Sequence, residues 1–235
     1  MNSIIIGANS RIAQSIIYHI APDNEQVMAI SSKPLSFDLT NVTCLRCQYT
    51  EQDIQNTIEE IKRLNLSSIN RIYICNGVLH SNDLQVEKRL EDLTSESIHT
   101  IIDSNAITPI LWLQALLPLV KDQLCKIAVF SARVGSINDN KLGGWYSYRA
   151  SKAALNMLLK TASIEYARRA KGVKLIAFHP GTTDTPLSRP FHGNISKDKL
   201  FTPQFVAEQL EGILDTLTPD GELDYLDWEG KKIEW

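Results

Sequence analysis

Short runs of apolar residues recur along the chain, and the stretches between them carry apolar residues three and four positions apart. A continuous apolar run of about four to eight residues predicts a strand buried on both faces, whereas the second spacing predicts a helix with one buried side. The runs predict strands at Asn2–Gly7, Val27–Ser31, Val42–Tyr49, Arg71–Cys75, Lys126–Ser131, Val173–Phe178 and Leu223–Leu226. The helical spacing predicts helices at Ile12–Ile20, Thr50–Leu64, Ser95–Leu119, Trp145–Ala170 and Pro203–Leu217.

Strands and helices therefore alternate along the chain, which requires crossover connections between parallel strands. The pattern predicts an α/β fold, a single doubly wound Rossmann-type parallel sheet with helices on both faces. We expect one domain over residues 1–235, because no linker or repeat divides the chain. The stretch at about 182–201 is rich in Thr, Pro, Gly, Ser and Lys and lacks periodicity, which predicts a mobile loop with a short helix.

The composition is that of a globular protein, with 43% apolar and 22% charged residues. Lys and Arg number 24 against 27 Asp and Glu, so no basic field favours nucleic acid or an anionic membrane, and we expect a small-molecule partner. The longest uncharged run, between Asp103 and Lys121, is too short and polar to span a bilayer and predicts a buried helix. The first residues lack the basic region of a signal peptide, so we expect a cytoplasmic protein with reduced cysteines.

Two features at the predicted carboxyl edge of the sheet carry chemistry. The segment Gly7–Ala13 joins the first strand to the first helix, where backbone N–H groups can bind a phosphate, although one glycine also suits an ordinary turn. Tyr148 and Lys152 lie four residues apart in a predicted helix and face the same way. A nearby ammonium lowers the pKa of a tyrosine and makes it a usable general acid, although this spacing is also common on solvated helices.

Other conspicuous residues have structural explanations. Cys44 and Cys47 face opposite sides of a predicted strand and have no second pair, so we interpret them as core thiols. Trp145 and Tyr146 precede the helix of Tyr148, and lining a pocket or packing in the core are both open to them. We predict no metal site, because the histidines are scattered without ligand spacing at His19, His80, His99, His179 and His192.

The order of the motifs over essentially the whole chain resembles the short-chain dehydrogenase/reductase family. Within that family, the stretch from Ser131 to Asn156 and the tail DWEGKKIEW are similar to the C-factor and sniffer-type carbonyl reductase branch. The motifs that carry the resemblance are GANSRIA at 7–13, Cys75-Asn76-Gly77, Asn105, Ser131, YRASK at 148–152 and PGTTDT at 180–185.

The resemblance implies a role for each of these motifs. Tyr148 would donate a proton to a carbonyl oxygen, Lys152 would hold the nicotinamide ribose and Asn105 would anchor a water, while a serine orients the carbonyl. The segment 182–201 would be the substrate loop, and the protein would be a homodimer or homotetramer. The implied cofactor contacts are Gly7, Asn9, Ser10, Arg11, Ile12, Asn76, Gly77, Pro180, Gly181, Thr183 and Thr185.

The cofactor preference follows from the end of the second strand. An acidic residue there would bind the ribose diol of NAD, but the chain reads Ser31, Ser32 and Lys33, with Arg11 in the first turn. Two hydroxyls and two cations suit a 2′-phosphate, so we predict that NADP(H) is preferred over NAD(H). Arg11 also departs from the family's glycine pattern, which puts the exact shape of that loop in doubt, while Ala13 is small enough to replace another glycine.

The catalytic serine is a second departure from the family. Where most members read Ser-Ser-x-x-Gly, the second serine is Ala132 here, aligned on Gly135. Ser131 and Ser136 are the nearby hydroxyls, and we favour Ser131 because it adjoins the expected position.

The sequence thus predicts an NADP(H)-dependent oxidoreductase that acts on a ketone, an aldehyde or the corresponding alcohol. One alternative is a regulatory nucleotide-binding protein with little turnover, suggested by the altered glycine turn and serine. Another is a flavodoxin-like FMN module, which leaves Tyr148, Lys152 and the segment at 180–185 unexplained.

Overall fold

The computed structural model describes residues 1–81, 83–194 and 196–235, and its centre is a sheet of seven parallel strands. The strand order reverses between β1 and β4, as in the doubly wound Rossmann-type fold, which confirms the predicted fold class. A flavodoxin-like sheet has the order 2-1-3-4-5, so the FMN hypothesis is wrong. In spatial order the strands are β3 (Val42–Arg46), β2 (Gln26–Ser31), β1 (Asn2–Ile6), β4 (Arg71–Ile74), β5 (Cys125–Phe130), β6 (Val173–His179) and β9 (Leu223–Asp227).

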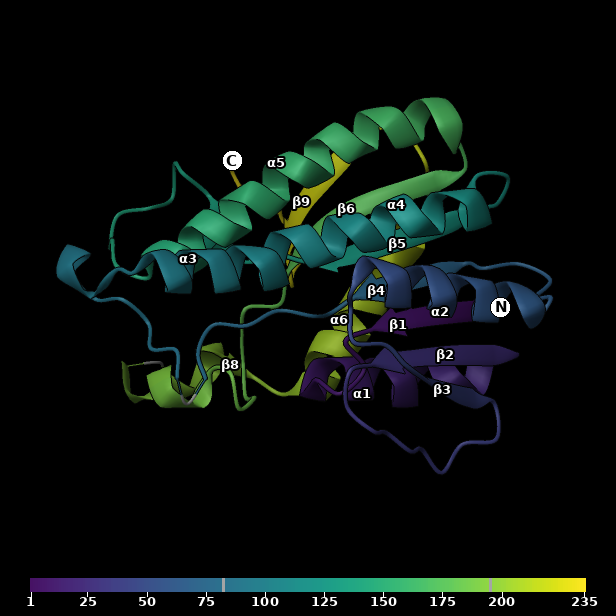
Figure 1. Ribbon diagram of the computed structural model, residues 1–235, viewed down its shortest axis with the longest axis horizontal. Coiled ribbons are helices and arrows are strands. Elements are labelled where there is room, and N and C mark those ends of the chain that lie inside the picture. The colour runs from purple at the N-terminus through teal and green to yellow at the C-terminus, as the bar shows by residue number, and fades with distance from the viewer. Residues whose placement is uncertain (82, 195) are drawn as a thin grey trace.

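Helices cover both faces of the sheet (Figure 1). Ile4 and Ile6 of β1 pack into the core shared with α2, α4 and α5, while Ile5 packs into the core shared with α1 and α6. Because successive side chains of a strand point to opposite faces, both faces are apolar, and the strands read as uninterrupted apolar runs. The bounds are α1 (Arg11–Ile20) and α6 (Pro203–Thr216) on one face, and α2 (Glu51–Arg63), α4 (Thr108–Val120) and α5 (Tyr146–Arg169) on the other.

The long helix predicted at Ser95–Leu119 is interrupted. It consists of α3 (Ser95–Ile102), a wider π-helical turn at Asp103–Ile107, and α4. Pro109 has no N–H to bond the carbonyl of Asn105, and its ring crowds that carbonyl, so an ordinary turn cannot form there. The predicted long helix is thus present as the helical run Ser95–Val120, and its wider turn, which the periodicity did not predict, carries the fully buried Asn105.

By length and composition alone, the run Ser95–Val120 could cross a membrane. In this fold, 56% of its most apolar stretch is buried inside the molecule, and Trp112 and Leu116 are fully buried in the core. The core helix of a globular protein passes the same test, so this run is weak evidence for a membrane span.

Two further predicted elements differ from the structure. β3 ends at Arg46 instead of Tyr49, because Tyr49 has a left-handed backbone with φ 64° and cannot continue an extended strand. The segment 182–201, where the structure describes it at residues 182–194 and 196–201, contains 3₁₀ turns at Arg189–Asn194 and Lys197–Lys199. Its ends pair as the parallel strands β7 (Thr182–Thr183) and β8 (Leu200–Phe201). The expectation of a loop with one short helix is thus incomplete.

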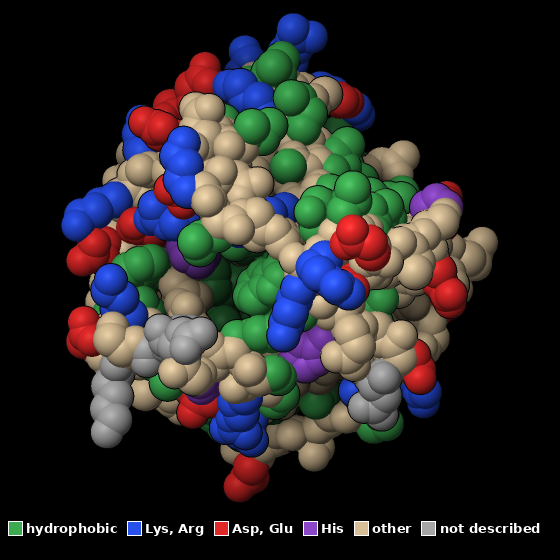
Figure 2. Space-filling view, turned by 90° about the vertical axis from the view of Figure 1, so that its left-hand side faces the viewer, with side chains coloured by type: hydrophobic (Ala, Val, Ile, Leu, Met, Phe, Trp, Pro, Cys, Tyr) green, Lys and Arg blue, Asp and Glu red, His purple; other side chains and the backbone are tan. Residues whose placement is uncertain are grey.

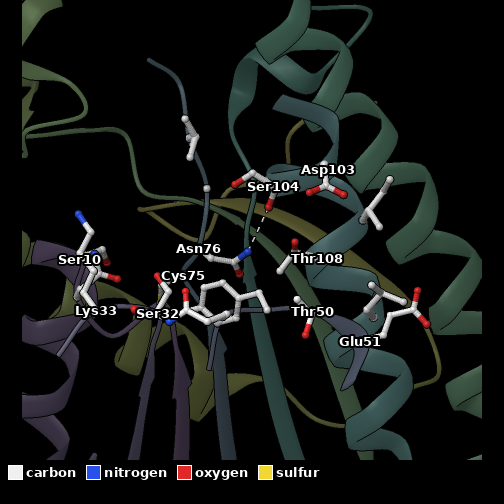
Figure 3. Close-up of a pocket in the computed structure, with 18 residues that line it drawn as sticks. Ser10, Ser32, Lys33, Thr50, Glu51, Cys75, Asn76, Asp103, Ser104 and Thr108 are labelled. Carbon is white, nitrogen blue, oxygen red and sulfur yellow. Dashed lines mark hydrogen bonds between the residues drawn. The ribbon is translucent and has the colours of Figure 1, made fainter. Parts of the chain in front are cut away.

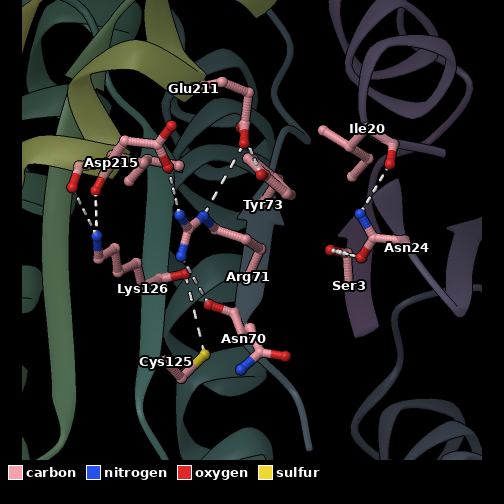
Figure 4. A network of polar contacts seen from close by, with 11 residues as sticks. Ser3, Ile20, Asn24, Asn70, Arg71, Tyr73, Cys125, Lys126, Glu211 and Asp215 are labelled. Atoms are coloured by element: carbon pink, nitrogen blue, oxygen red, sulfur yellow. Dashed lines mark hydrogen bonds and ion pairs between the residues drawn. The ribbon is translucent and has the colours of Figure 1, made fainter. Parts of the chain in front are cut away.

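A polar network fixes α6 at the amino ends of β4 and β5 (Figure 4). The buried hydroxyl of Tyr73 donates a hydrogen bond to Glu211 at 2.5 Å, and Arg71 pairs with Asp215 at 2.8 Å. Lys126 donates to the carbonyl of Leu214 at the end of the same helix. These contacts lie at the edge of the sheet opposite the site described next and hold α6 against the strands.

Candidate active site

A cleft lies at the carboxyl ends of the strands, beside the point where the strand order reverses. It consists of cavities of about 640 and 430 Å³ that share the lining residues Asn9, Ser10, Lys33, Cys75, Asn76 and Gly77, so the two form one elongated cleft. Figure 2 views this end of the molecule, where a central hollow has hydrophobic side chains within it and Lys, Arg and His side chains around it. A crevice outside the carboxyl ends of parallel strands is where doubly wound folds bind their ligands.

The floor of the cleft is made by two strand ends in close contact. Gly7 has a left-handed backbone with φ 79°, and a side-chain carbon there would lie 2.6 Å from the backbone nitrogen of Asn76, so only glycine fits. Ser10 begins α1 and accepts a hydrogen bond from Ala13 N at 3.1 Å. The amide of Asn76 donates to the carbonyl of Ser104 at 3.2 Å, across the larger cavity (Figure 3). The turn between β1 and α1 therefore faces the cleft without a side chain at Gly7, and the amino end of α1 lies beside it.

Most predicted cofactor residues line this cleft, and some do not. Ser31 is buried, donates to Asn9 Oδ1 at 3.3 Å and accepts from Lys33 N at 3.0 Å, so its hydroxyl shapes the turn. Thr183 is also buried, and its hydroxyl donates to Pro180 O at 3.3 Å. Gly181 does not line either cavity. The predicted residues that do line the cleft are Gly7, Asn9, Ser10, Arg11, Ile12, Ser32, Lys33, Asn76, Gly77, Pro180 and Thr185.

Sequence reasoning missed the far end of the larger cavity. Its wall there is formed by residues 48–51, which connect β3 to α2, and by residues of the π-helical turn and α4. The segment 48–51 spans the junction of the strand predicted at Val42–Tyr49 and the next predicted helix, so its position at the carboxyl edge was available from the strand order. The lining residues not predicted are Gln48, Tyr49, Thr50, Glu51, Cys75, Val78, Asp103, Ser104, Ile107, Thr108, Leu111, Phe130, Pro186 and Leu187.

Tyr148 and Lys152 meet in the smaller cavity, one turn apart on α5. The Lys152 ammonium lies 5.8 Å from the centre of the Tyr148 ring and donates to Phe130 O at 2.8 Å. Asn105 lies behind them, accepting from Val78 N at 2.6 Å and donating to Ser151 Oγ at 3.0 Å. The Asn105 side chain does not line the cleft; it ties the strand end after β4 to α5.

Burial controls the protonation of both residues. It raises the pKa of Tyr148 well above the ordinary value of 10, and the hydroxyl of Tyr225 adds to this shift. Burial also lowers the pKa of Lys152 to about 8, and its side chain is almost inaccessible. The Tyr148 pKa is thus raised by desolvation and not lowered by Lys152 as expected, and Tyr148 holds its proton at neutral pH.

The hydroxyls of both candidate serines already form hydrogen bonds within the protein. Ser131 lines the smaller cavity, but its hydroxyl donates to Asn156 Oδ1 at 2.6 Å. Ser136 is buried outside both cavities, and its hydroxyl accepts from Asp139 N at 3.2 Å. Ala132 lies between them in the chain, with its carbonyl accepting from Tyr225 at 2.6 Å.

Aromatic side chains gather beside Tyr148, on the side of segment 182–201. The Trp145 ring meets the Tyr148 ring at a centroid distance of 6.2 Å and the Phe191 ring at 4.8 Å. His80 stacks edge-on against Phe191 at 5.7 Å and bonds the carbonyl of Leu187 at 3.0 Å. Lining a pocket and packing in the core were the two possibilities left open for Trp145. It is half-buried and packs on Tyr148 and Phe191, and it is not among the residues that line the two cavities.

One cysteine, Cys75, lines both cavities of the cleft. The four cysteines are free; Cys47 is buried as predicted, but Cys44 is exposed, so its interpretation as a core thiol is wrong. Within residues 1–81, 83–194 and 196–235, no group of three His, Cys, Asp or Glu side chains could hold a metal ion.

Comparison with known sequences gives a consistent picture. A model of the family described as short chain dehydrogenase matches residues 2–195. A 1-hydroxy-2-glutathionyl-2-methyl-3-butene dehydrogenase from Rhodococcus sp. strain AD45 is 27% identical over 232 residues, covering 99% of this chain and 98% of that protein. The C-signal of Myxococcus xanthus is 33% identical over 132 residues, covering 56% of this chain and 74% of its own length.

Solved structures with a similar fold include carbonyl reductases. The NADPH-bound carbonyl reductase from chicken fatty liver is similar with a TM-score of 0.84 and 26% identity, covering 99% of this chain and 98% of that one. The carbonyl reductase Sniffer of D. melanogaster has the same TM-score at 18% identity, covering 100% and 99%, and this likeness shows the fold alone.

Proposed function

Because this chain belongs to the short-chain dehydrogenase family, we propose that this oxidoreductase is an NADPH-dependent carbonyl reductase. In this role it reduces a ketone or an aldehyde, or oxidises the corresponding alcohol. The observation that carries the proposal is the convergence of Tyr148 and Lys152 on a cleft that continues to the start of α1. A proton donor at one end and a phosphate-binding turn at the other are the two parts that carbonyl reduction by a dinucleotide requires.

The cleft fits a dinucleotide. Gly7 keeps the first turn free of side chains, and Ser10 begins the helix whose backbone N–H groups suit a diphosphate. Residues 48–51 and the π-helical turn would enclose the adenosine half, in the larger cavity. NADPH, when bound, supplies the hydride; the chain supplies the binding surface, the orientation and the proton.

The preference for NADPH rests on three side chains at the cleft. Ser32 lines the larger cavity, Lys33 lines both, and Arg11 lines the smaller one. Lys and Arg are the side chains that bind phosphate most strongly, and no carboxylate ends β2 to repel one. The NADPH bound to the similar chicken carbonyl reductase is consistent with this assignment.

Tyr148 is the proposed proton donor. A tyrosine hydroxyl whose pKa is 10 or above is protonated at neutral pH, so Tyr148 has a proton to give to an oxygen on which negative charge develops. Lys152 would stabilise the phenolate that remains, and its position is fixed by the carbonyl of Phe130. Asn105 orders the surrounding backbone by bonding Val78 on one side and Ser151 on the other.

Ser131 is the proposed orienting hydroxyl, because it is the candidate serine that lines the cleft. To bond a carbonyl, its hydroxyl would have to turn away from Asn156. The loss of one such hydrogen bond slows a reaction by about tenfold to a hundredfold, so the chemistry can proceed from Tyr148 alone at a reduced rate.

A regulatory protein that binds NADPH without turning it over is the second candidate. Two observations favour it: Ala132 stands where the family places serine, and the chain is 33% identical to part of a C-signal. The test is NADPH oxidation by the purified protein with a panel of ketones and aldehydes. Steady oxidation that depends on the carbonyl compound supports the reductase, while NADPH binding without turnover on any panel member or its alcohol favours the regulatory protein.

The remaining assignments are proposals that follow from the family. We place the enzyme in the cytoplasm as a homodimer or homotetramer, with a small carbonyl compound or alcohol as its partner and no role for nucleic acid or membrane. The net charge of −3 is consistent with this choice of partner. Sedimentation analysis of the purified protein tests the assembly.

A further inference from the structure

The turn that leads into α5 is strained. Trp145 precedes the helix with a left-handed backbone, φ 53° and ψ 44°, and its side chain does not cap the helix. A bulky residue in this conformation is an outlier, because its side chain crowds the backbone. Such strain persists only where surrounding contacts hold it in place.

Glu87 provides those contacts. Its backbone carbonyl accepts a hydrogen bond from Trp145 N at 2.6 Å. Its carboxylate accepts from Ser147 N at 3.3 Å, from the Ser147 hydroxyl, and from the Ser97 hydroxyl of α3 at 3.2 Å. The Glu87 side chain is buried, at 4% exposure, and takes the place of the missing helix cap with a negative charge at the positive end of the helix.

The residues that Glu87 holds are neighbours of the chemistry. Trp145 lies against Tyr148 and Phe191, and Tyr148 follows Ser147 directly in the first turn of α5. We propose that Glu87 is a positioning residue that keeps Trp145 packed against Tyr148 and Phe191 and keeps Tyr148 at its place in the cleft. The proposal rests on the proposed carbonyl reductase function.

Substitutions of Glu87 and of a control residue distinguish a role in positioning Tyr148 from a role in stabilising the fold. Glu87→Ala removes every acceptor of the side chain, while Glu87→Gln keeps its size and one oxygen. Leu159→Ala is the matched control, because it destabilises the same helix three turns beyond Tyr148, at a fully buried position outside the cleft. All rates are expressed per folded enzyme, and NADPH dissociation constants are measured alongside.

We expect Glu87→Ala to lower kcat by about 10- to 100-fold, as a displacement of about 1 Å at a reacting group does. Glu87→Gln should lower kcat less than Glu87→Ala, because it keeps one acceptor oxygen. The NADPH dissociation constant should be the same as that of the wild type in both variants. Leu159→Ala lowers the melting temperature with an unchanged kcat. An unchanged kcat in Glu87→Ala, or an equal loss in Leu159→Ala, overturns the proposal. Should Glu87→Ala not fold, Glu87→Gln alone decides: a lowered kcat supports the proposal and an unchanged kcat overturns it.

A second readout keeps this test independent of the proposed function. If the wild-type protein reduces no carbonyl compound, the function proposal has failed, and amide hydrogen exchange then decides the role of Glu87. Faster exchange confined to residues 144–149 in Glu87→Gln supports its hold on this turn. Exchange that is unchanged there, or accelerated along the whole helix, overturns it.

Discussion

Lys152 gives a prediction whose size follows from its burial. The residue is 3% exposed, so keeping the charge costs the folded protein free energy, and the pKa falls from 10.5 to about 8. Between these two values the unfolded chain binds more protons than the folded one, so the free energy of unfolding rises with pH across this window. The substitution Lys152→Met removes the titrating group and replaces it with an apolar side chain of similar length.

The size of the effect follows from the two pKa values. One pKa unit corresponds to about 1.4 kcal/mol, so the free energy of unfolding rises by about 3 kcal/mol in all because of this shift. Between pH 7 and pH 9 it rises by about 1.3 kcal/mol. Lys152→Met also leaves the carbonyl of Phe130 without its donor. That loss costs about 1 to 3 kcal/mol at every pH, so only the change with pH is diagnostic.

Urea denaturation of wild type and Lys152→Met at pH 7 and pH 9, without added cofactor, measures this change. We expect the wild type to gain about 1.3 kcal/mol more than the variant over this interval, because all other titrating groups are common to both. Lys160→Met, on the exposed side of the same helix and paired with Glu222 at 2.8 Å, is the control and should follow the wild type. Parallel pH dependence in wild type and Lys152→Met would refute the reasoning.

Three other sets of substitutions test the site. Tyr148→Phe should lower kcat by about two to four orders of magnitude with the NADPH dissociation constant unchanged, because only the proton donor is lost; full activity would exclude Tyr148 as the donor. Arg11→Ala or Lys33→Ala should weaken NADPH binding and leave NADH binding nearly unaffected in titrations; equal affinities of the wild type for both cofactors would contradict the 2′-phosphate assignment. At saturating NADPH, Ser131→Ala should slow turnover by about tenfold to a hundredfold and Ser136→Ala should not; if neither does, Tyr148 acts without a serine.

The fold was predictable because the apolar runs are long and their alternation with helices is regular. The π-helical turn at Asp103–Ile107 was not predicted, because apolar spacing continues through it. Asn105 bonds the backbone of Val78, which is 27 residues away in the chain. Pro109 is a local signal for a disturbed helical turn, and a prediction from apolar periodicity alone does not use it.

The candidate site was predictable where a motif combines with a strand end. Gly7, Tyr148 and Lys152 line the cleft as expected, because the helix spacing and the sheet edge place them there. The commitment of the Ser131 hydroxyl to Asn156 depends on how α5 packs on β5, which sequence spacing does not determine. Glu87 gave no sequence signal, because it lies in an irregular connection and its partners are ten and sixty residues away.

The pairing of β7 with β8 brings the two ends of segment 182–201 together, about 5 Å apart, as neighbouring strands are. The chain leaves the scaffold and returns to it at nearly one place, so lengthening the stretch between them adds little closure entropy. The paired strands β7 and β8 hold the two ends of the segment together, whatever the length of the stretch between them. The stretch after Leu187 can therefore change in length while Thr185, Pro186 and Leu187 keep their places in the wall of the cleft.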